Sequence, residues 1–315
     1  MALRGAVYVN GTIKPAHEAV VPVYDHGFLY GEGVYETLRT YRKIPFLYDR
    51  HTGRLRASAA RIHLDVPFDD AQLAQWIDET VAAALPGWRS EQRGASGSRE
   101  ASEPGGVQGG PPNNNEAYIR ILLTRGVGEL NYDPRSTPTP TTVIIVKPLD
   151  EPPARVFTEG INICLVPILR NHPGSVNPLI KANNLLNNAL AMQEANRRGG
   201  EEGLMCNFRG ELSECSQANF FMVRDGVVLT PKSEAGLLEG ITRAFMFEVG
   251  NETSVDVREA VLTPEDLETA DEAFITSTTR ELSPVTTIDG RPVGPGTPGP
   301  ITKKLLDAYR RRAYA

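Results

Sequence analysis

The sequence predicts two α+β domains, each with its own core. Segments with strand-like alternation are interleaved along the whole chain with segments of helical spacing. A stiff, proline-rich run over 148–155 divides the chain near its middle. The length of 315 residues also allows two cores of ordinary size. We therefore predict a small N-terminal domain over 1–147, a linker over 148–155 and a larger C-terminal domain over 156–315.

The N-terminal half begins with a predicted β-hairpin. Strand-like residues flank Asn10-Gly11, a dipeptide that tolerates the positive φ angles of a tight turn. A glycine-punctuated stretch over 25–39 then ends in strand-like alternation. The other predicted elements of this half are helices from His51 and over 71–84, and strands over 118–124 and 142–146.

One segment of this half has a composition unlike the rest. Residues 86–112 hold seven glycines and four prolines, with serine and charged residues among them. Such a segment cannot form a packed element. We expect a flexible insertion over 86–115 in the small domain.

The second half mixes strands with helices. Asp225-Gly226 predicts another hairpin turn, and Thr263 before Pro264 predicts a helix N-cap followed by proline at the first helical position. Residues 288–300 hold eight glycines and prolines and are predicted to form a loop. The predicted strands are 161–166, 203–207, 220–223, 227–230 and 273–276, and the predicted helices begin near Asn183, Ile241, Pro264 and Ile301.

The composition argues against several classes of function. A net charge of −6 gives no field that attracts nucleic acid or anionic membranes. Three cysteines without C-x-x-C spacing argue against a disulfide framework and a zinc ribbon, and five scattered histidines argue against a metal site. No apolar run approaches the length of a membrane span. We expect a cytoplasmic protein without a metal.

Lys181 is the first candidate for chemistry. It is the only lysine, arginine, aspartate or glutamate between Arg170 and Glu194, in a stretch of apolar and amide side chains. A lysine in such surroundings can be partly buried, which makes its amine a nucleophile toward an aldehyde. Taken alone, the pattern is more typical of a surface lysine at the start of a helix.

Two later segments offer groups that bind anions. The run Gly240-Ile241-Thr242 begins a predicted helix, whose first backbone amides and hydroxyl are free to bind a phosphate. Ser277-Thr278-Thr279 follows a predicted strand and supplies further donors. Taken alone, Thr242 could be a simple helix cap and Glu214 a solvated turn residue.

The order of these segments resembles a known family. The run Glu214-x-Ser216-x-x-Asn219-Phe220-Phe221, then Leu229-Thr230 and Leu238-x-Gly240-Ile241-x-Arg243, is similar to the signature of fold-type IV pyridoxal-phosphate enzymes. That family includes branched-chain and D-amino-acid aminotransferases and aminodeoxychorismate lyase. Further matching segments are Tyr30-Gly31-x-Gly33-Val34-Tyr35-Glu36, His51-x-x-Arg54-Leu55, Tyr118-Ile119-Arg120, Thr124-Arg125-Gly126-Val127-Gly128, Asn177-Pro178-x-x-Lys181 and Thr276-Ser277-Thr278-Thr279-Arg280-Glu281.

The resemblance implies a fold, a cofactor and an assembly. The fold would be a small N-terminal α/β domain and a larger mixed domain with a β-barrel-like core. The cofactor would be pyridoxal 5′-phosphate. Members of the family are homodimers whose active sites include residues of the partner subunit, so we expect a homodimer or larger assembly. The other partners would be small amino acids and 2-oxo acids.

The resemblance also implies roles for individual residues. Lys181 would hold the cofactor as an aldimine and carry the proton between substrate and cofactor. Glu214 would pair with the pyridine nitrogen, and Leu238 would pack on the ring. The phosphate would be bound by Arg54, Ile241, Thr242 and Thr278. The substrate would be lined by Tyr30, Tyr35, Arg39, Tyr118, Arg120 and Thr279.

Within the family, the sequence looks most like prokaryotic branched-chain aminotransferases. An arginine beside apolar walls would let one pocket admit both an aliphatic side chain and the γ-carboxylate of glutamate, with 2-oxoglutarate as the acceptor. Thr37 stands where glycine is usual, and Leu185 replaces a tyrosine, as in D-amino-acid aminotransferases. The alternatives are therefore a D-amino-acid transaminase, an aminodeoxychorismate lyase and a cofactor-free scaffold. The intact Lys181, Glu214, Arg54 and Thr242 argue against the scaffold.

Overall fold

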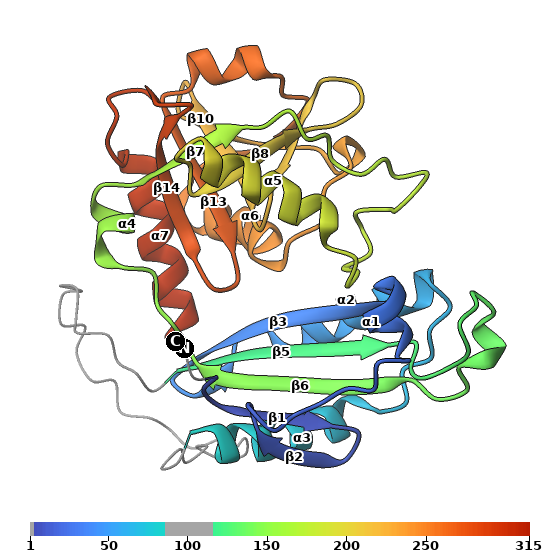
Figure 1. The fold of residues 1–315 in the computed structure, drawn as a ribbon. Helices are drawn as coiled ribbons and strands as arrows, with labels where there is room; N and C mark the ends of the chain where they lie inside the picture. The colour runs from blue at the N-terminus through green and yellow to red at the C-terminus, as the bar shows by residue number, and fades with distance from the viewer. Residues whose placement is uncertain (1–2, 86–115) are drawn as a thin grey trace, which may run out of the picture.

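The computed structural model describes residues 3–85 and 116–315, which form two units stacked one above the other (Figure 1). The predicted insertion over 86–115 lies outside the described residues. Strand β6 ends at Pro148 and helix α4 begins at Ala154, so the predicted linker runs between regular elements of the two units.

The N-terminal unit is built on a six-stranded antiparallel sheet with the order β2-β1-β6-β5-β3-β4. Helices α2 and α3 pack against it, and the short α1 precedes β3. Its strands are β1 Ala6–Val9, β2 Thr12–Pro15, β3 Gly33–Tyr41, β4 Ile44–Pro45, β5 Ala117–Thr124 and β6 Thr141–Pro148. Its helices are α1 His26–Tyr30, α2 Tyr48–Arg61, α3 Asp70–Ala84 and the 3₁₀ turn Pro134–Ser136.

Strand β5 shows how the sequence assigns the two faces of this sheet. Ile119, Ile121 and Leu123 are fully buried in the core with α2 and α3. Tyr118 and Arg120 alternate with them and are only half-buried. Because successive strand residues point to opposite faces, the second face carries the polar and aromatic side chains. That face is turned toward the C-terminal unit (Figure 1).

The C-terminal unit contains a nine-stranded mixed sheet with the order β12-β11-β10-β13-β14-β7-β8-β9, and β15 pairs with β14. The sheet curls, because β9 at one end packs against β10 and β11. Its strands are β7 Ile161–Leu165, β8 Glu202–Cys206, β9 Leu212–Cys215, β10 Asn219–Arg224, β11 Val227–Pro231, β12 Val257–Ala260, β13 Glu272–Ser277, β14 Glu281–Ile288 and β15 Arg291–Pro292.

Helices cover this sheet on different sides. Helix α5 packs on β7 and β8, whereas α6 and α7 pack together and against β13 (Figure 1). The helices are α4 Ala154–Thr158, α5 Leu186–Arg197, α6 Ile241–Thr253 and α7 Pro300–Ala313, with 3₁₀ turns at Ser233–Ala235 and Pro264–Thr269. No helix within 3–85 and 116–315 is long and apolar enough to cross a membrane.

The predicted α+β class is confirmed, and so are both hairpins. The predicted helix near Asn183 begins only at Leu186, because Ala182 and Asn183 lie extended against β3: the Asn183 N–H donates to the Gly33 carbonyl. The element at Pro264 is a 3₁₀ turn, and it has the predicted cap at Thr263. The predicted loop over 288–300 contains the short strand β15.

Replacement of Ile119 by alanine should lower the free energy of unfolding by about 3 kcal/mol, because it leaves a cavity in the centre of the N-terminal core. Ile44→Ala is the matched control, since Ile44 is 41% exposed and Ile119 is fully buried. Chemical denaturation measures both. Equal losses in the two variants would contradict the placement of this core.

Candidate active site

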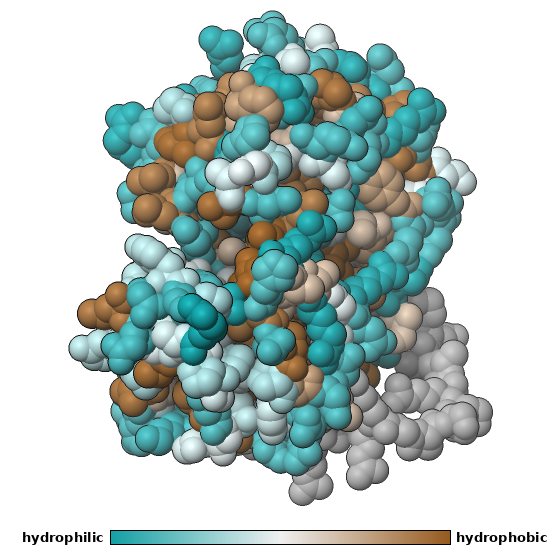
Figure 2. All heavy atoms as spheres, turned by 90° about the vertical axis from the view of Figure 1, so that its right-hand side faces the viewer, coloured by the Kyte–Doolittle hydropathy of each residue, from teal (hydrophilic) through white to brown (hydrophobic). Residues whose placement is uncertain are grey.

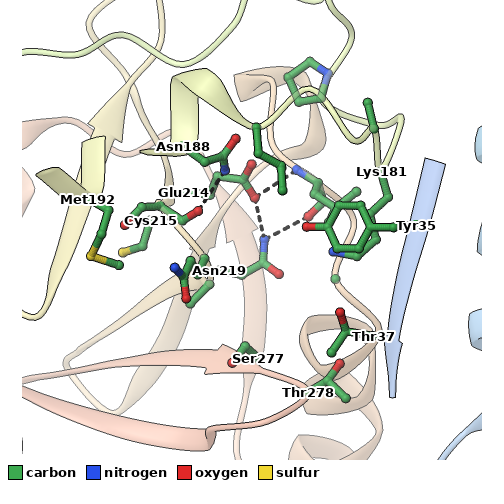
Figure 3. A pocket seen from close by; sticks show the side chains of 18 of the residues that line it. Tyr35, Thr37, Lys181, Asn188, Met192, Glu214, Cys215, Asn219, Ser277 and Thr278 are labelled. Carbon is green, nitrogen blue, oxygen red and sulfur yellow. Dashed lines mark hydrogen bonds between the residues drawn. The ribbon is translucent and has the colours of Figure 1, made fainter. Parts of the chain in front are cut away.

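A cavity of about 590 Å³ lies between the two units. Side chains of β3 and β5 form its wall on the N-terminal side, and the segments around Lys181, Glu214, Thr242 and Thr278 form it on the C-terminal side. Figure 3 shows Lys181 beside Tyr35 on β3, with Glu214 and Asn219 facing the same space. The structure therefore brings together residues that are far apart in the sequence.

Lys181 is held in place by its backbone. Its carbonyl accepts a hydrogen bond from the Tyr35 N–H at 2.9 Å, and its own N–H donates to the Ser58 hydroxyl at 3.2 Å. The amine lies 4.4 Å from the centre of the Tyr35 ring. Within the described part of the chain, Nζ forms no hydrogen bond or ion pair. The amine is therefore available to a ligand in the cavity.

Glu214 is buried at the end of β9, and both of its carboxylate oxygens are engaged. Arg170 Nε donates to Oε1 at 2.8 Å. The Leu238 N–H donates to Oε2 at 3.0 Å, and Asn219 Nδ2 donates to the same oxygen at 3.3 Å (Figure 3). Opposed donors of this kind fix the direction in which a carboxylate points.

The contact between Arg170 and Glu214 is a feature that sequence reasoning missed. The two residues are 44 positions apart, and nothing in their local patterns links them. Arg170 also donates from Nη1 to the Asn187 side chain at 2.9 Å, which ties it to α5. Arg170 also lines the cavity, and its hydrogen bond to Oε1 fixes the orientation of the Glu214 carboxylate.

The N-terminus of α6 forms one corner of the cavity. Ile241 and Thr242 open this helix, where backbone amides have no partner within the helix. Gly240 precedes them, and a Cβ at this position would lie 2.0 Å from Asn219 Oδ1, so only glycine lets the two segments meet. Arg54 reaches the same corner, where its Nη1 donates to the Glu239 carbonyl at 3.0 Å.

Arg54 is oriented by a buried carboxylate. Its Nε and Nη2 donate to Glu36 at 2.7 and 2.9 Å, and His51 Nδ1 lies 2.7 Å from Glu36 Oε2. Burial alone would raise the pKa of Glu36, but Arg54 and His51 outweigh it and lower that pKa to about 2. Burial lowers the pKa of His51 in spite of the neighbouring carboxylate. The group is therefore an ionised Glu36 held against Arg54 and a neutral His51.

The turn between β13 and β14 closes the cavity. Thr278 and Thr279 both line it. Figure 3 shows Thr278 with Ser277 at this side of the cavity. Leu238 lines the cavity as well, and its backbone N–H is the group that donates to Glu214. The predicted cofactor residues Arg54, Lys181, Glu214, Leu238, Ile241, Thr242 and Thr278 all lie around one space.

The predicted substrate-side residues divide into two groups. Tyr35, Tyr118, Arg120 and Thr279 line the cavity, together with Thr37 and Leu185. The guanidinium of Arg120 lies 4.1 Å from the centre of the Tyr35 ring, and among the described residues it has no acidic partner. Arg120 therefore brings an uncompensated positive charge to this wall.

Arg39 and Tyr30 do not line this cavity within the single chain. Arg39 is fully buried at the far end of β3, where it forms a two-pronged pair with Glu151 at 2.5 and 3.1 Å. Tyr30 packs against His26 and Tyr132 at the end of α1. Arg39 faces the linker, and Tyr30 faces a neighbouring loop.

Comparison with known proteins places the chain in a family. The family model described as Amino-transferase class IV matches residues 33–288. The chain belongs to the class IV aminotransferases. It is 34% identical over 96% of its length to a putative branched-chain-amino-acid aminotransferase of Methanocaldococcus jannaschii, 95% of which is covered. It is 33% identical, again over 96% of its length, to a D-alanine aminotransferase of Listeria innocua, 94% of which is covered.

The fold of this chain is similar to that of a solved aminotransferase structure. The branched-chain amino acid aminotransferase of Thermobaculum terrenum in its PLP form has a TM-score of 0.79 and 27% identity, with 99% of this chain and 94% of the other covered. Class IV aminotransferases depend on pyridoxal phosphate, and the cavity fits that group. It combines a free amine, a fixed carboxylate and a corner of anion donors, the three features that an aldehyde, a ring nitrogen and a phosphate require.

Replacement of Glu36 by glutamine should lower the free energy of unfolding at pH 7 by about 3 kcal/mol, the value of a pKa lowered to about 2. A carboxyl with a lowered pKa stabilises the fold above its unfolded pKa of about 4.5, and this contribution is lost as the pH falls toward 2. The difference between the two proteins should therefore shrink over that range. Denaturant titrations at several pH values measure it.

Asp70→Asn is the matched control for this measurement, because Asp70 forms an exposed ion pair with Arg56 of α2. It should change stability by less than about 0.5 kcal/mol. A Glu36→Gln loss that does not vary between pH 7 and pH 3 would argue against an ionised Glu36.

Proposed function

We propose that this aminotransferase transfers the amino group of branched-chain L-amino acids to 2-oxoglutarate. The observation that carries the proposal is that Tyr35 and Tyr118 form an aromatic wall beside Arg120, which has no acidic partner among the residues that the structure describes. The aromatic faces suit an aliphatic side chain. The guanidinium suits the second carboxylate of glutamate or 2-oxoglutarate.

Lys181 is the proposed catalytic residue. When bound, pyridoxal phosphate supplies an aldehyde for amines and an electron sink for the charge that develops at the substrate Cα. The Lys181 amine would hold the cofactor through its aldehyde, and as a base it would carry the proton of the substrate Cα. Its place beside Tyr35, without an ion-pair partner among the described residues, suits both tasks.

The other residues would orient the cofactor. Glu214 would pair with the ring nitrogen, in the direction that Arg170 and the Leu238 amide impose on its carboxylate. The Leu238 side chain would pack against the ring. The phosphate would be bound by Arg54, the amides of Ile241 and Thr242, and the hydroxyl groups of Thr242 and Thr278. The backbone at Thr279 would receive the α-carboxylate of the substrate.

A D-amino-acid transaminase is the second candidate. The D-alanine aminotransferase of Listeria innocua is nearly as similar to this chain as the branched-chain relative, at 33% against 34% identity. Leu185 lines the cavity, and a leucine at this point is part of the resemblance to D-amino-acid aminotransferases. The half-reaction with L-leucine and with D-alanine separates the two candidates.

We also infer a homodimer in the cytoplasm. Val23, Tyr24 and Phe28 are exposed on the segment before β3, and Leu130 and Tyr132 are exposed on the loop after β5. The two segments are neighbours, since the Gly128 N–H donates to the Tyr24 carbonyl at 3.3 Å. Figure 2 views the molecule from the side on which the loop after β5 projects in Figure 1, and apolar residues lie among polar ones on that face. Such a patch suits a second copy of the chain.

The three cysteines are free thiols, which suits the reducing environment of the cytoplasm.

Analytical ultracentrifugation measures the oligomeric state, and a protein that stays monomeric at all concentrations would contradict the dimer. Tyr30 lies beside Tyr132 on the exposed face, so in a dimer we expect any contact between Tyr30 and substrate to involve the partner's cavity.

Lys181→Ala should lower the transamination rate with L-leucine by about a thousandfold or more, because no other amine replaces its proton transfers. The half-reaction spectrum with pyridoxal phosphate and L-leucine measures this loss. Lys303→Ala is the matched control, since Lys303 is exposed on α7 and does not line the cavity. Wild-type rates in Lys181→Ala would refute the role, and a wild-type response to D-alanine but not to L-leucine would favour the second candidate.

Arg120→Leu should weaken the half-reaction with L-glutamate by about tenfold to a hundredfold, because a charge-assisted hydrogen bond to the γ-carboxylate is lost. The rate with L-leucine should stay within about threefold, since its side chain carries no charge. Arg155→Leu, which breaks an exposed pair with Glu201, serves as the control. An equal loss with both substrates would argue against a role in recognising glutamate.

A further inference from the structure

The turn between β13 and β14 is followed directly by a buried glutamate, Glu281. Thr278, Thr279 and Arg280 line the cavity, whereas Glu281, the first residue of β14, does not. Ser277 pairs with Glu281 across the ladder, and the Arg280 N–H donates to the Ser277 carbonyl at 3.3 Å. The conformation at Glu281 therefore sets how the three preceding residues are presented.

The backbone of Glu281 is left-handed, with a φ of 56°. Glycine is the residue that adopts this conformation without steric cost, and it commonly fills such positions after hairpin turns. A glutamate here accepts strain that glycine would avoid. The side chain must therefore contribute something that outweighs the strain.

The carboxylate of Glu281 connects its own strand, β14, to β3 and α7. Tyr41 at the end of β3 donates from its hydroxyl to Oε1 at 2.8 Å, and Arg310 of α7 donates from Nε to Oε2 at 2.8 Å. Arg39 Nη1 lies 3.7 Å from Oε1. Glu281 is 4% exposed, so hydrogen bonds from these partners take the place of hydrogen bonds from water to its carboxylate. Burial raises the pKa of Tyr41, which keeps its hydroxyl protonated as a donor.

The turn has a second attachment on its other side. Arg280 donates to the buried Glu202 at 2.6 Å and to the Gln217 side chain at 3.2 Å. Both of these partners belong to the C-terminal unit, whereas Tyr41 and Arg39 belong to the N-terminal unit. Glu281 is thus the point at which the N-terminal unit holds this turn.

We propose that Glu281 is a positioning residue for anion recognition: its buried carboxylate, held by Tyr41 and Arg310, fixes the turn that presents Thr278 and Thr279 to the anionic groups of cofactor and substrate. This inference rests on the proposed function, in which Thr278 binds the phosphate and the Thr279 backbone receives the α-carboxylate. Glu281 itself touches neither. Neither Arg39 nor Tyr41 lines the cavity, and both contact the turn at Glu281.

The test compares the dissociation constants of pyridoxal phosphate and of pyridoxal, which lacks the phosphate, in wild-type protein and in Glu281→Gln. Glutamine keeps the size of the side chain but removes the charge that faces Arg310 and Arg39. The Kd for pyridoxal phosphate should rise by about tenfold. The Kd for pyridoxal should change by less than about twofold, because it makes no phosphate contact. Absorbance titration measures both without turnover.

Tyr41→Phe is a milder second variant, since it removes one donor and keeps the ring. It should show the same selective loss, reduced to about threefold. Glu252→Gln is the matched control. Glu252 of α6 forms an exposed ion pair with Arg312, which lies on α7 like Arg310. It should leave both dissociation constants unchanged.

The outcomes are distinct. A selective loss for pyridoxal phosphate in Glu281→Gln and Tyr41→Phe supports the inference. An equal loss for both ligands, accompanied by a lower unfolding temperature, means that Glu281 only stabilises the fold and overturns it, as does no change for either ligand. Wild-type protein that binds no pyridoxal phosphate would instead overturn the proposed function.

Discussion

The hydrogen bonds between the Lys181 segment and strand β3 are the contact on which the rest of the site depends. The Tyr35 N–H donates to the Lys181 carbonyl, and the Asn183 N–H donates to the Gly33 carbonyl, each at 2.9 Å. They attach a segment of the C-terminal unit to the N-terminal sheet. A Cβ on Gly33 would lie 2.6 Å from both the Asn183 side chain and the Leu123 carbonyl, so the close approach requires glycine.

Buried carboxylates surround the cavity that this contact creates. Glu36 holds Arg54, Arg170 holds Glu214, and Glu281 is held by Arg310. Buried ion pairs add little net stability, because the desolvation of both charges offsets their attraction. Their value here is geometric, since each one fixes the direction of a side chain or a turn that faces the cavity. The same pairs make the site sensitive to single substitutions that leave one charge unpartnered.

The sequence predicts most of the chemistry of this site and little of what supports it. Lys181, Glu214 and Thr242 lie in local runs whose order resembles a family, and the structure places all three around one cavity. The resemblance implies a place there for Arg39 too. It lies at the end of the strand, beyond the cavity, where it meets Glu151 across 112 positions of sequence. Such long-range pairs leave no local pattern, and the same holds for Arg170 and Glu214.

The two walls of the cavity come from separate units, and this has a consequence for how such a protein changes over evolution. On the proposed roles, bond-making groups reside in the C-terminal unit, whereas the side chains that sort substrates project from β3 and β5 of the N-terminal sheet. Exchanges at Thr37 or Tyr118 can therefore alter which amine is accepted without disturbing Lys181. This separation offers a physical reason why relatives named for branched-chain amino acids and for D-alanine resemble this chain almost equally.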